Sequence, residues 1–328
     1  MRRREFITLL GRAAFAWPLA ARAQQRAAAP TIGFLTPIGL TTQTLLVDGF
    51  RRGLKEVGFV EGQNVNIEYR SAENDYDRLP SLVDELIRQH VVLIFANAST
   101  PAALAAKAAT TAIPIVFTVG VDPVTYGLVA SLARPGGNIT GVTFLTSELA
   151  TKQLEVAHLL LPNASSIGVL VNPKNQYAET DIKNIQDTAL LLKKKILVLK
   201  VDADRDFDAA FATFVQQGAD IFIVPGDAFF YDRRDKLVAL AARYALPAIY
   251  AQREFVDGGG FMSYGANNSE ANRLAGVYVG RILKGEKAAD LPVQQVTKLE
   301  FVINLMTAKA LGIAMPQSLL GRADEVIE

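Results

Sequence analysis

The sequence contains no cysteine in 328 residues. Disulfide bonds, thiolate catalysis and a lipid anchor on cysteine are therefore excluded. Histidine is nearly absent as well: His90 and His158 are the only two, and neither stands in a motif that would make it a general base or a metal ligand. The zinc-protease motif HExxH, the hydrolase motif GxSxG and the phosphate-binding P-loop do not occur. We therefore expect a protein that is not an enzyme and that needs no cofactor and no metal.

Long apolar runs are also scarce, and the longest lies at the N-terminus. Residues 6–20 are mostly apolar, but Arg12 interrupts them, so the run is too short and broken to span a membrane. The sequence Arg-Arg-Glu-Phe-Ile at residues 3–7 resembles the twin-arginine export motif, and Ala21-Arg22-Ala23 fits a small-x-small cleavage site. We predict a signal peptide over residues 1–23 that directs export by the twin-arginine or the general secretory pathway. The mature chain is then periplasmic, without stable membrane insertion.

The chain also lacks an excess of positive charge once this segment is set aside. Removing the five arginines and the single glutamate of residues 1–23 from totals of 34 basic and 33 acidic residues leaves 29 and 32. The mature net charge is therefore near −3, which gives no reason to expect a nucleic-acid partner.

Short apolar segments alternate with helical spacing along the rest of the chain. Strand starts fall near residues 32, 65, 92 and 115, and the pattern returns with starts near 167, 196, 221 and 248. This pattern predicts an α/β fold of two doubly wound parallel-sheet lobes joined by a hinge, with a cleft between them. We assign residues 24–142 and about 267–286 to the first lobe. The second takes residues 143–266, with residues 287–328 added to it as an open assignment.

The stretch from Val91 to Asn138 indicates where such lobes would bind a ligand. An apolar strand leads into a polar turn in which Ser99 or Thr100 suits a helix N-cap, and a helix and a second apolar strand follow. Open α/β sheets bind small molecules at the carboxyl ends of their strands, and helix N-termini favour anionic groups. Equivalent loops in both lobes are rich in small polar and aromatic residues. The candidate ligand-binding residues are Thr36, Asn97, Ser99, Thr100, Asp122, Asn172, Tyr177, Asp227, Phe229 and Gln252.

These groups could clamp a small molecule from two sides. Hydroxyls and free N–H groups would take a carboxylate, Asp122 or Asp227 an ammonium, and Tyr177, Phe229 or Phe230 an apolar body. Because Phe229 and Phe230 are consecutive, we expect at most one of them to face the cleft. Ordinary turn chemistry is the competing explanation for each residue. If both aspartates turn away, an aromatic carboxylate without an ammonium would fit instead.

Several short segments are distinctive. They are GLKEVGFVEGQN at 53–64, IPIVF at 113–117, DPV at 122–124, SLARPGGNITG at 131–141, VNP at 171–173 and REFV at 253–256. In these segments the chain resembles the ABC-transporter substrate-binding proteins of the tryptophan/tyrosine-binding type, which have a type I periplasmic binding fold. The resemblance implies a periplasmic receptor that delivers a solute to an ABC permease in the inner membrane, where a separate subunit hydrolyses ATP.

The sequence therefore predicts the solute-binding component of an ABC importer. Its ligand is expected to be small, to bear a carboxylate and to be aromatic or amino-acid-like. Two alternatives stay open. One is a periplasmic receptor that reports its ligand to a membrane signalling protein, and the other is a sugar- or nucleoside-binding member of the same fold.

Overall fold

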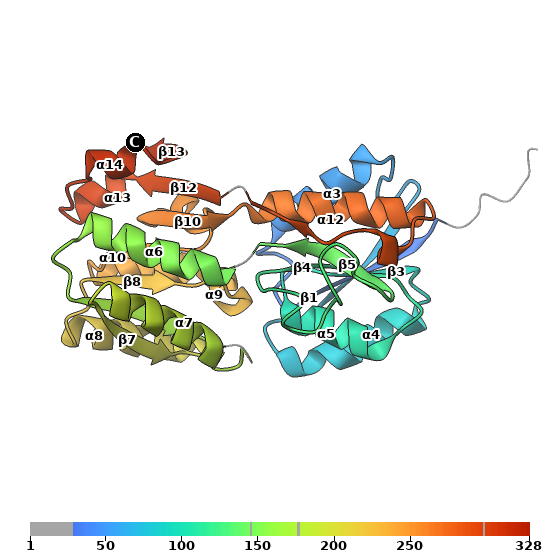
Figure 1. The fold of residues 1–328 in the computed structure, drawn as a ribbon, viewed down its shortest axis with the longest axis horizontal. Helices are drawn as coiled ribbons and strands as arrows, with labels where there is room; N and C mark the ends of the chain where they lie inside the picture. The colour runs from blue at the N-terminus through green and yellow to red at the C-terminus, as the bar shows by residue number, and fades with distance from the viewer. Residues whose placement is uncertain (1–28, 145, 176–177, 298) are drawn as a thin grey trace, which may run out of the picture.

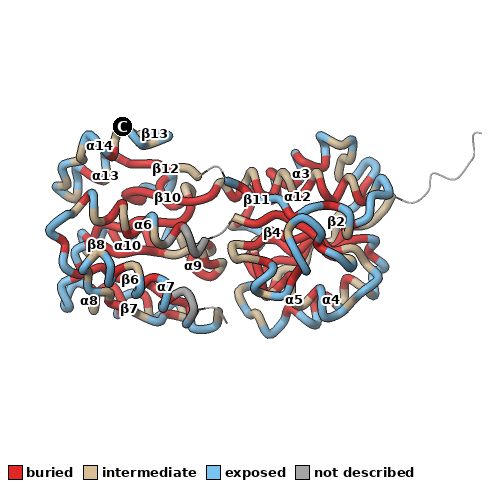
Figure 2. Tube along the Cα trace, viewed as in Figure 1, coloured by how far each residue is buried: buried red, intermediate tan, exposed pale blue. Residues whose placement is uncertain are grey.

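The computed structural model of the protein describes residues 29–144, 146–175, 178–297 and 299–328, so the expected signal peptide and Tyr177 lie outside the described residues. Two lobes lie side by side, each a sheet with helices on both faces (Figure 1). The central strands of both sheets are buried (Figure 2). The α/β fold class and its two-lobed architecture, which we predicted from the alternating pattern, are confirmed.

The first lobe is built on a six-stranded sheet in the order β11-β5-β4-β3-β1-β2, whose paired strands are all parallel. Its strands are β1 (Thr31–Thr36), β2 (Asn66–Ser71), β3 (Leu93–Ala96), β4 (Ile115–Val119), β5 (Ile139–Thr143) and β11 (Gln294–Gln295). Strands β3 and β4 are buried on both faces because helices cover both. These helices are α4 (Leu79–Arg88) and α5 (Thr100–Ala109) on one face, and α3 (Thr44–Glu56) and α12 (Asn268–Leu283) on the other.

The second lobe has a seven-stranded sheet in the order β13-β12-β10-β9-β8-β6-β7. Its strands are β6 (Ser166–Val171), β7 (Lys195–Lys200), β8 (Ile221–Val224), β9 (Ala248–Tyr250), β10 (Met262–Ala266), β12 (Leu299–Asn304) and β13 (Glu325–Ile327). Helices α6 (Thr146–Leu160), α7 (Ala178–Leu191), α13 (Leu305–Ala310) and α14 (Gln317–Leu320) cover one face. Helices α8 (Phe207–Gln216), α9 (Ala228–Asp232), α10 (Arg234–Arg243) and α11 (Glu254–Asp257) cover the other.

The chain crosses between the lobes after β5, after β10 and after β11. Strand β12 therefore enters the second sheet from the side that faces the first lobe, and it pairs antiparallel with β10, which runs the opposite way. The short turn η4 (Ala288–Asp290) and β11 lie against β5 of the first lobe, whereas the chain from Leu299 onward joins the second. Within the described ranges, no helix is long and apolar enough to cross a bilayer.

Two glycines let α12 lie directly on α3. A Cβ atom on Gly53 would stand 1.8 Å from the carbonyl oxygen of Arg273, and one on Gly276 would stand 2.2 Å from that of Phe50. Any larger residue would separate the two backbones. The contact continues to the start of α12, where the Ser269 hydroxyl donates to the carbonyl oxygen of Leu45 at 3.3 Å, so Asn268, the first residue of α12, lies near the N-terminal end of α3.

Candidate functional site

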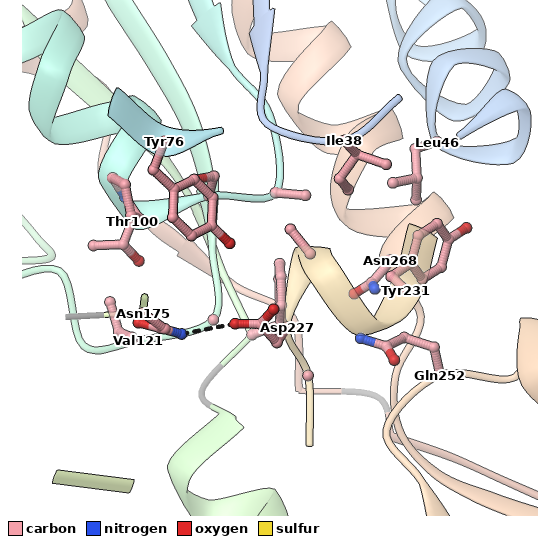
Figure 3. A pocket seen from close by; sticks show the side chains of 17 residues that line it. Ile38, Leu46, Tyr76, Thr100, Val121, Asn175, Asp227, Tyr231, Gln252 and Asn268 are labelled. Atoms are coloured by element: carbon pink, nitrogen blue, oxygen red, sulfur yellow. Dashed lines mark hydrogen bonds between the residues drawn. The ribbon is translucent and has the colours of Figure 1, made fainter. Parts of the chain in front are cut away.

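A cavity lies between the two lobes, at the carboxyl ends of the strands (Figure 3). Its volume is about 80 Å³, counted as the space that the centre of a water molecule can occupy. Both lobes line it. The lining residues are Ile38, Leu46, Tyr76, Ala98, Ser99, Thr100, Pro101, Gly120, Val121, Phe144, Asn175, Gly226, Asp227, Ala228, Tyr231, Gln252 and Asn268. The position agrees with the rule that open α/β sheets bind ligands where their strands end.

The start of α5 forms the polar wall of the first lobe. Ser99 is the N-cap, and its hydroxyl accepts a hydrogen bond from the amide of Ala102 at 3.2 Å. Thr100 follows, 6% exposed, and within the described chain neither its hydroxyl nor its amide has an intramolecular hydrogen-bond partner. Its hydroxyl, its amide and the positive end of the helix dipole are therefore available to an anionic group in the cavity.

A buried hydrogen-bond network holds this wall from behind. The carboxamide oxygen of Gln43 accepts hydrogen bonds from the Asn97 amide at 2.8 Å and the Thr36 hydroxyl at 3.2 Å. The Thr118 hydroxyl accepts a hydrogen bond from the amide of Ala98 at 2.7 Å. All four side chains in this network are fully buried. Thr36 and Asn97, two of the predicted ligand-binding residues, thus lie beneath the cavity and position the loops that line it.

Asp227 presents the charge on the opposite wall. It caps α9 by accepting a hydrogen bond from the Phe229 amide at 2.8 Å, and its two carboxylate oxygens accept from Asn172 at 3.2 Å and Asn175 at 3.0 Å. The residue is 9% exposed, and burial raises the pKa of its carboxyl above the usual range, although these hydrogen bonds counteract the effect. A cation placed against it would offset the cost of burying the charge.

Aromatic and apolar side chains form the rest of the lining. Tyr76 comes from the turn η2 (Tyr76–Arg78) of the first lobe; burial and the facing Asp227 carboxylate both raise the pKa of its hydroxyl. Tyr231 of α9 is 4% exposed, and Ile38 and Leu46 of the first lobe pack into the apolar cluster beneath it. The lining thus combines a carboxylate and a free helix terminus with flat apolar surfaces, which is the composition of a small-molecule site.

Gln252 adds an acceptor whose bonding capacity is not used. Its side chain is 8% exposed and lines the cavity, and its oxygen Oε1 is buried without a hydrogen-bond partner among the described residues. Buried polar atoms are normally satisfied, so an orphaned acceptor at a cavity wall points to a donor supplied by a ligand or a water molecule.

Comparison with protein families matches residues 32–327 to the family described as ABC transporter substrate binding protein. The chain belongs to this family. A tyrosine-binding protein of Clostridioides difficile is 30% identical to this substrate-binding protein over 265 residues, which cover 81% of this chain and 76% of the relative.

Two solved structures extend the likeness. An ABC domain in complex with L-Trp from Streptococcus pneumoniae has a TM-score of 0.82 at 26% identity, covering 92% of this chain and all of the other. The ligand-free, open structure of a Clostridium difficile substrate-binding protein with adhesive properties has a TM-score of 0.65 at 27% identity, covering 91% and 99%. The substrate-binding protein thus has a type I periplasmic binding fold, and its family is a class of binding proteins rather than enzymes.

Four of the ten candidate residues line the cavity of the substrate-binding protein: Ser99, Thr100, Asp227 and Gln252. Asn172 lies immediately behind Asp227. Asp122 turns away, because its carboxylate accepts hydrogen bonds from the Val124 amide at 2.9 Å and the Thr125 hydroxyl at 2.7 Å. These bonds lower the pKa of the Asp122 carboxyl, and the bond from the Thr125 hydroxyl has the largest effect. Asp122 caps its turn, which is the ordinary turn chemistry that competed with ligand binding as an explanation for each candidate.

Neither of the consecutive phenylalanines lines the cavity. The ring of Phe229 is stacked on Phe207 at 5.6 Å between ring centres, and the Arg233 guanidinium covers it at 3.9 Å. Phe230 is fully buried in the same cluster. Four lining residues with polar side-chain atoms were not among the candidates: Tyr76, Asn175, Tyr231 and Asn268. Asn175 and Tyr231 follow the candidates Asn172 and Asp227 within four residues in the sequence, whereas Tyr76 and Asn268 have no candidate residue nearby.

Proposed function

We propose that the protein is the periplasmic solute-binding component of an ABC importer and that its ligand is an aromatic amino acid. The observation that carries the proposal is the buried carboxylate of Asp227 at the wall of a cavity between two lobes. A neutral or anionic ligand would leave this charge buried without a cationic partner, whereas an α-ammonium group would supply one.

The other end of an amino acid finds a complement in the first lobe. The free hydroxyl and amide of Thr100 stand at the N-terminus of α5, where an α-carboxylate would be stabilised by hydrogen bonds and the helix dipole. Tyr76, Tyr231 and Phe144 offer rings for an aromatic side chain. The orphaned oxygen of Gln252 suits a donor such as a phenol hydroxyl or an indole N–H. The ligands named for the tyrosine-binding relative and the L-Trp complex have these groups.

The arrangement of the lobes supports binding by closure. Identity and coverage are nearly equal for the two solved relatives, but the TM-score is 0.82 to the L-Trp complex and 0.65 to the open, ligand-free structure. Because a hinge rotation alters the relative position of the lobes, this difference favours a closed arrangement here. Contacts from both lobes would then favour the closed state when the ligand is bound.

Export and delivery complete the proposal. The basic, apolar N-terminal segment and its small-x-small site support a signal peptide over residues 1–23. Family membership supports delivery of the ligand to an ABC permease of the inner membrane.

The test is calorimetric titration and thermal unfolding of the chain with a panel of solutes. The panel holds L-tryptophan, L-tyrosine, L-leucine, 3-indolepropionate, adenosine and glucose. A ligand at 100 times its dissociation constant should add about 2.7 kcal/mol to the free energy of unfolding. Stabilisation by the aromatic amino acids above the others is the expected result. A response to the nucleoside, the sugar or the indole acid alone would refute the assignment.

A further inference from the structure

The lobes are joined across the cleft by a polar cluster outside the cavity. Asp232, the last residue of α9 in the second lobe, accepts a hydrogen bond from the Thr42 hydroxyl through one carboxylate oxygen and from the Asn74 amide through the other, the latter at 2.5 Å. Arg234 donates from the same side to the carbonyl oxygen of Thr42 at 3.2 Å. The side chain of Asp232 is 15% exposed, so water screens these bonds only in part.

The first-lobe partners are held in place before they meet Asp232. The backbone N–H of Asn74 donates to the carbonyl of Pro37 at 2.7 Å, and the backbone at Asn74 has a φ of 63°, a left-handed conformation that asparagine tolerates well. Thr42 lies in a turn, and its backbone N–H donates to the carbonyl of Gly39 at 3.2 Å. The backbone that carries the two side-chain donors is thus held in place opposite a carboxylate with two oxygens. A charge-assisted bond to that carboxylate is stronger than a neutral one.

One short helix connects this cluster to the cavity. Helix α9 begins after Asp227 and includes Tyr231, both of which line the cavity, and it ends at Asp232. The Arg234 guanidinium lies over the Tyr231 ring at 5.2 Å and donates to its carbonyl oxygen at 3.3 Å. A ligand that packs on Tyr231 therefore fixes the segment that presents Asp232 and Arg234 to the first lobe.

We propose that Asp232 is a closure latch: a positioning residue that sets ligand affinity by stabilising the closed arrangement without touching the ligand. Binding and closure are linked, since the apparent dissociation constant equals the intrinsic one divided by the fraction of closed protein. Because Asp232 is partly exposed to water, the loss of its two bonds should count for less than that of fully buried ones, and we expect it to weaken binding about tenfold. The loss should appear mainly as faster ligand dissociation, because the closed complex is the state that the latch holds.

The absence of cysteine allows closure to be followed directly. Asp84→Cys on α4 and Gln186→Cys on α7 place two dyes on exposed helix positions, one in each lobe, for fluorescence energy transfer. The latch variant is Asp232→Ala. The matched control is Asp208→Asn, which removes a carboxylate from the same lobe that bonds only within that lobe, to Arg243 and Tyr244. Thermal unfolding confirms that each variant is folded.

Two arms of the measurement separate this proposal from the ligand assignment. Without any ligand, Asp232→Ala should shift the dye pair toward the open distance relative to the parent and to Asp208→Asn. In the second arm, L-tryptophan or L-tyrosine should dissociate from Asp232→Ala about tenfold faster than from the parent. If the parent binds neither amino acid, the ligand assignment is wrong, and the ligand-free arm still decides on the latch.

A double-mutant cycle with Thr42→Val tests the bond itself. That change removes the hydroxyl at similar volume, and alone it should reproduce part of the loss. The hydroxyl also lies 2.8 Å from the carbonyl oxygen of Gly39, a contact within the first lobe that remains in Asp232→Ala. In that background the change should therefore have a smaller effect on the dye distance and on ligand dissociation than it has alone. Additive effects, or an Asp232→Ala chain whose dye distance and dissociation rate match those of Asp208→Asn, would overturn the latch.

Discussion

Replacing Asp227 by asparagine should abolish amino-acid binding while leaving the fold nearly unchanged. Asparagine caps a helix as well as aspartate does, so the bond from the Phe229 amide survives in Asp227→Asn. The variant loses one of the bonds from Asn172 and Asn175, but it no longer buries a charge whose raised pKa shows the cost of desolvation. We expect these effects to offset one another and the free energy of unfolding to change by less than about 1.5 kcal/mol.

The effect on binding should be far larger. In the variant an α-ammonium group would be buried against a neutral amide, and removing one partner of a buried charge pair costs about 2–5 kcal/mol. Affinity for L-tryptophan and L-tyrosine should therefore fall by roughly 30- to 4,000-fold. An aromatic carboxylate without an ammonium, 3-indolepropionate, should lose nothing, because the carboxylate that repels it is gone.

Calorimetric titration of the parent and the variant with these three compounds measures the difference. Urea unfolding of both proteins without ligand supplies the stability control. If Asp227→Asn bound the amino acids within threefold of the parent, the ammonium would not be held by Asp227. If the variant were also destabilised by several kcal/mol, the carboxylate would have a structural role that its hydrogen bonds do not suggest.

Three further predictions concern pH, the helix terminus and the α3–α12 contact. Asp227 must be ionised to hold an ammonium, and burial raises the pKa of its carboxyl in the ligand-free protein. Calorimetric ligand titrations at several pH values across about pH 4–8 should therefore show the affinity for amino acids falling as the pH drops through that pKa. Ligand-free stability should instead fall as pH rises through it, and Asp227→Asn should remove both effects. Thr100→Val should weaken carboxylate binding in the same titration by about three- to tenfold at unchanged stability, whereas Ser99→Ala should lose about 1 kcal/mol of stability with its cap. Gly53→Ala should lower the unfolding free energy by about 1–3 kcal/mol, because its Cβ would stand 1.8 Å from a carbonyl oxygen; Gly321→Ala, whose nearest neighbour is at 3.4 Å, should be near neutral in the same urea assay.

The sequence predicted the architecture closely because local pattern decides it. The strand starts expected near residues 221 and 248 fall at Ile221 and Ala248 in the structure, because a short apolar run between turns leaves little choice. The sheet in which the residues after 287 pair was harder to predict from the sequence. Strand β11 is two residues long, and whether it joins the first or the second sheet depends on the path of the chain rather than on its own composition.

The site was harder to predict because turn chemistry and binding use the same residues. Asp122 and Asp227 both follow a strand, and both accept a hydrogen bond from the amide two residues on. To that extent their local hydrogen bonding is equivalent. The difference is tertiary. The second oxygen of Asp122 is satisfied by a hydroxyl of its own turn, whereas that of Asp227 is met by Asn175, which is 52 residues away in sequence. A carboxylate satisfied within its turn stays at the surface, whereas one bonded to a neighbouring loop is drawn between the lobes. Only the second kind can present a buried charge to a ligand, and the partner that decides this for Asp227, Asn175, is not evident from the sequence around the aspartate.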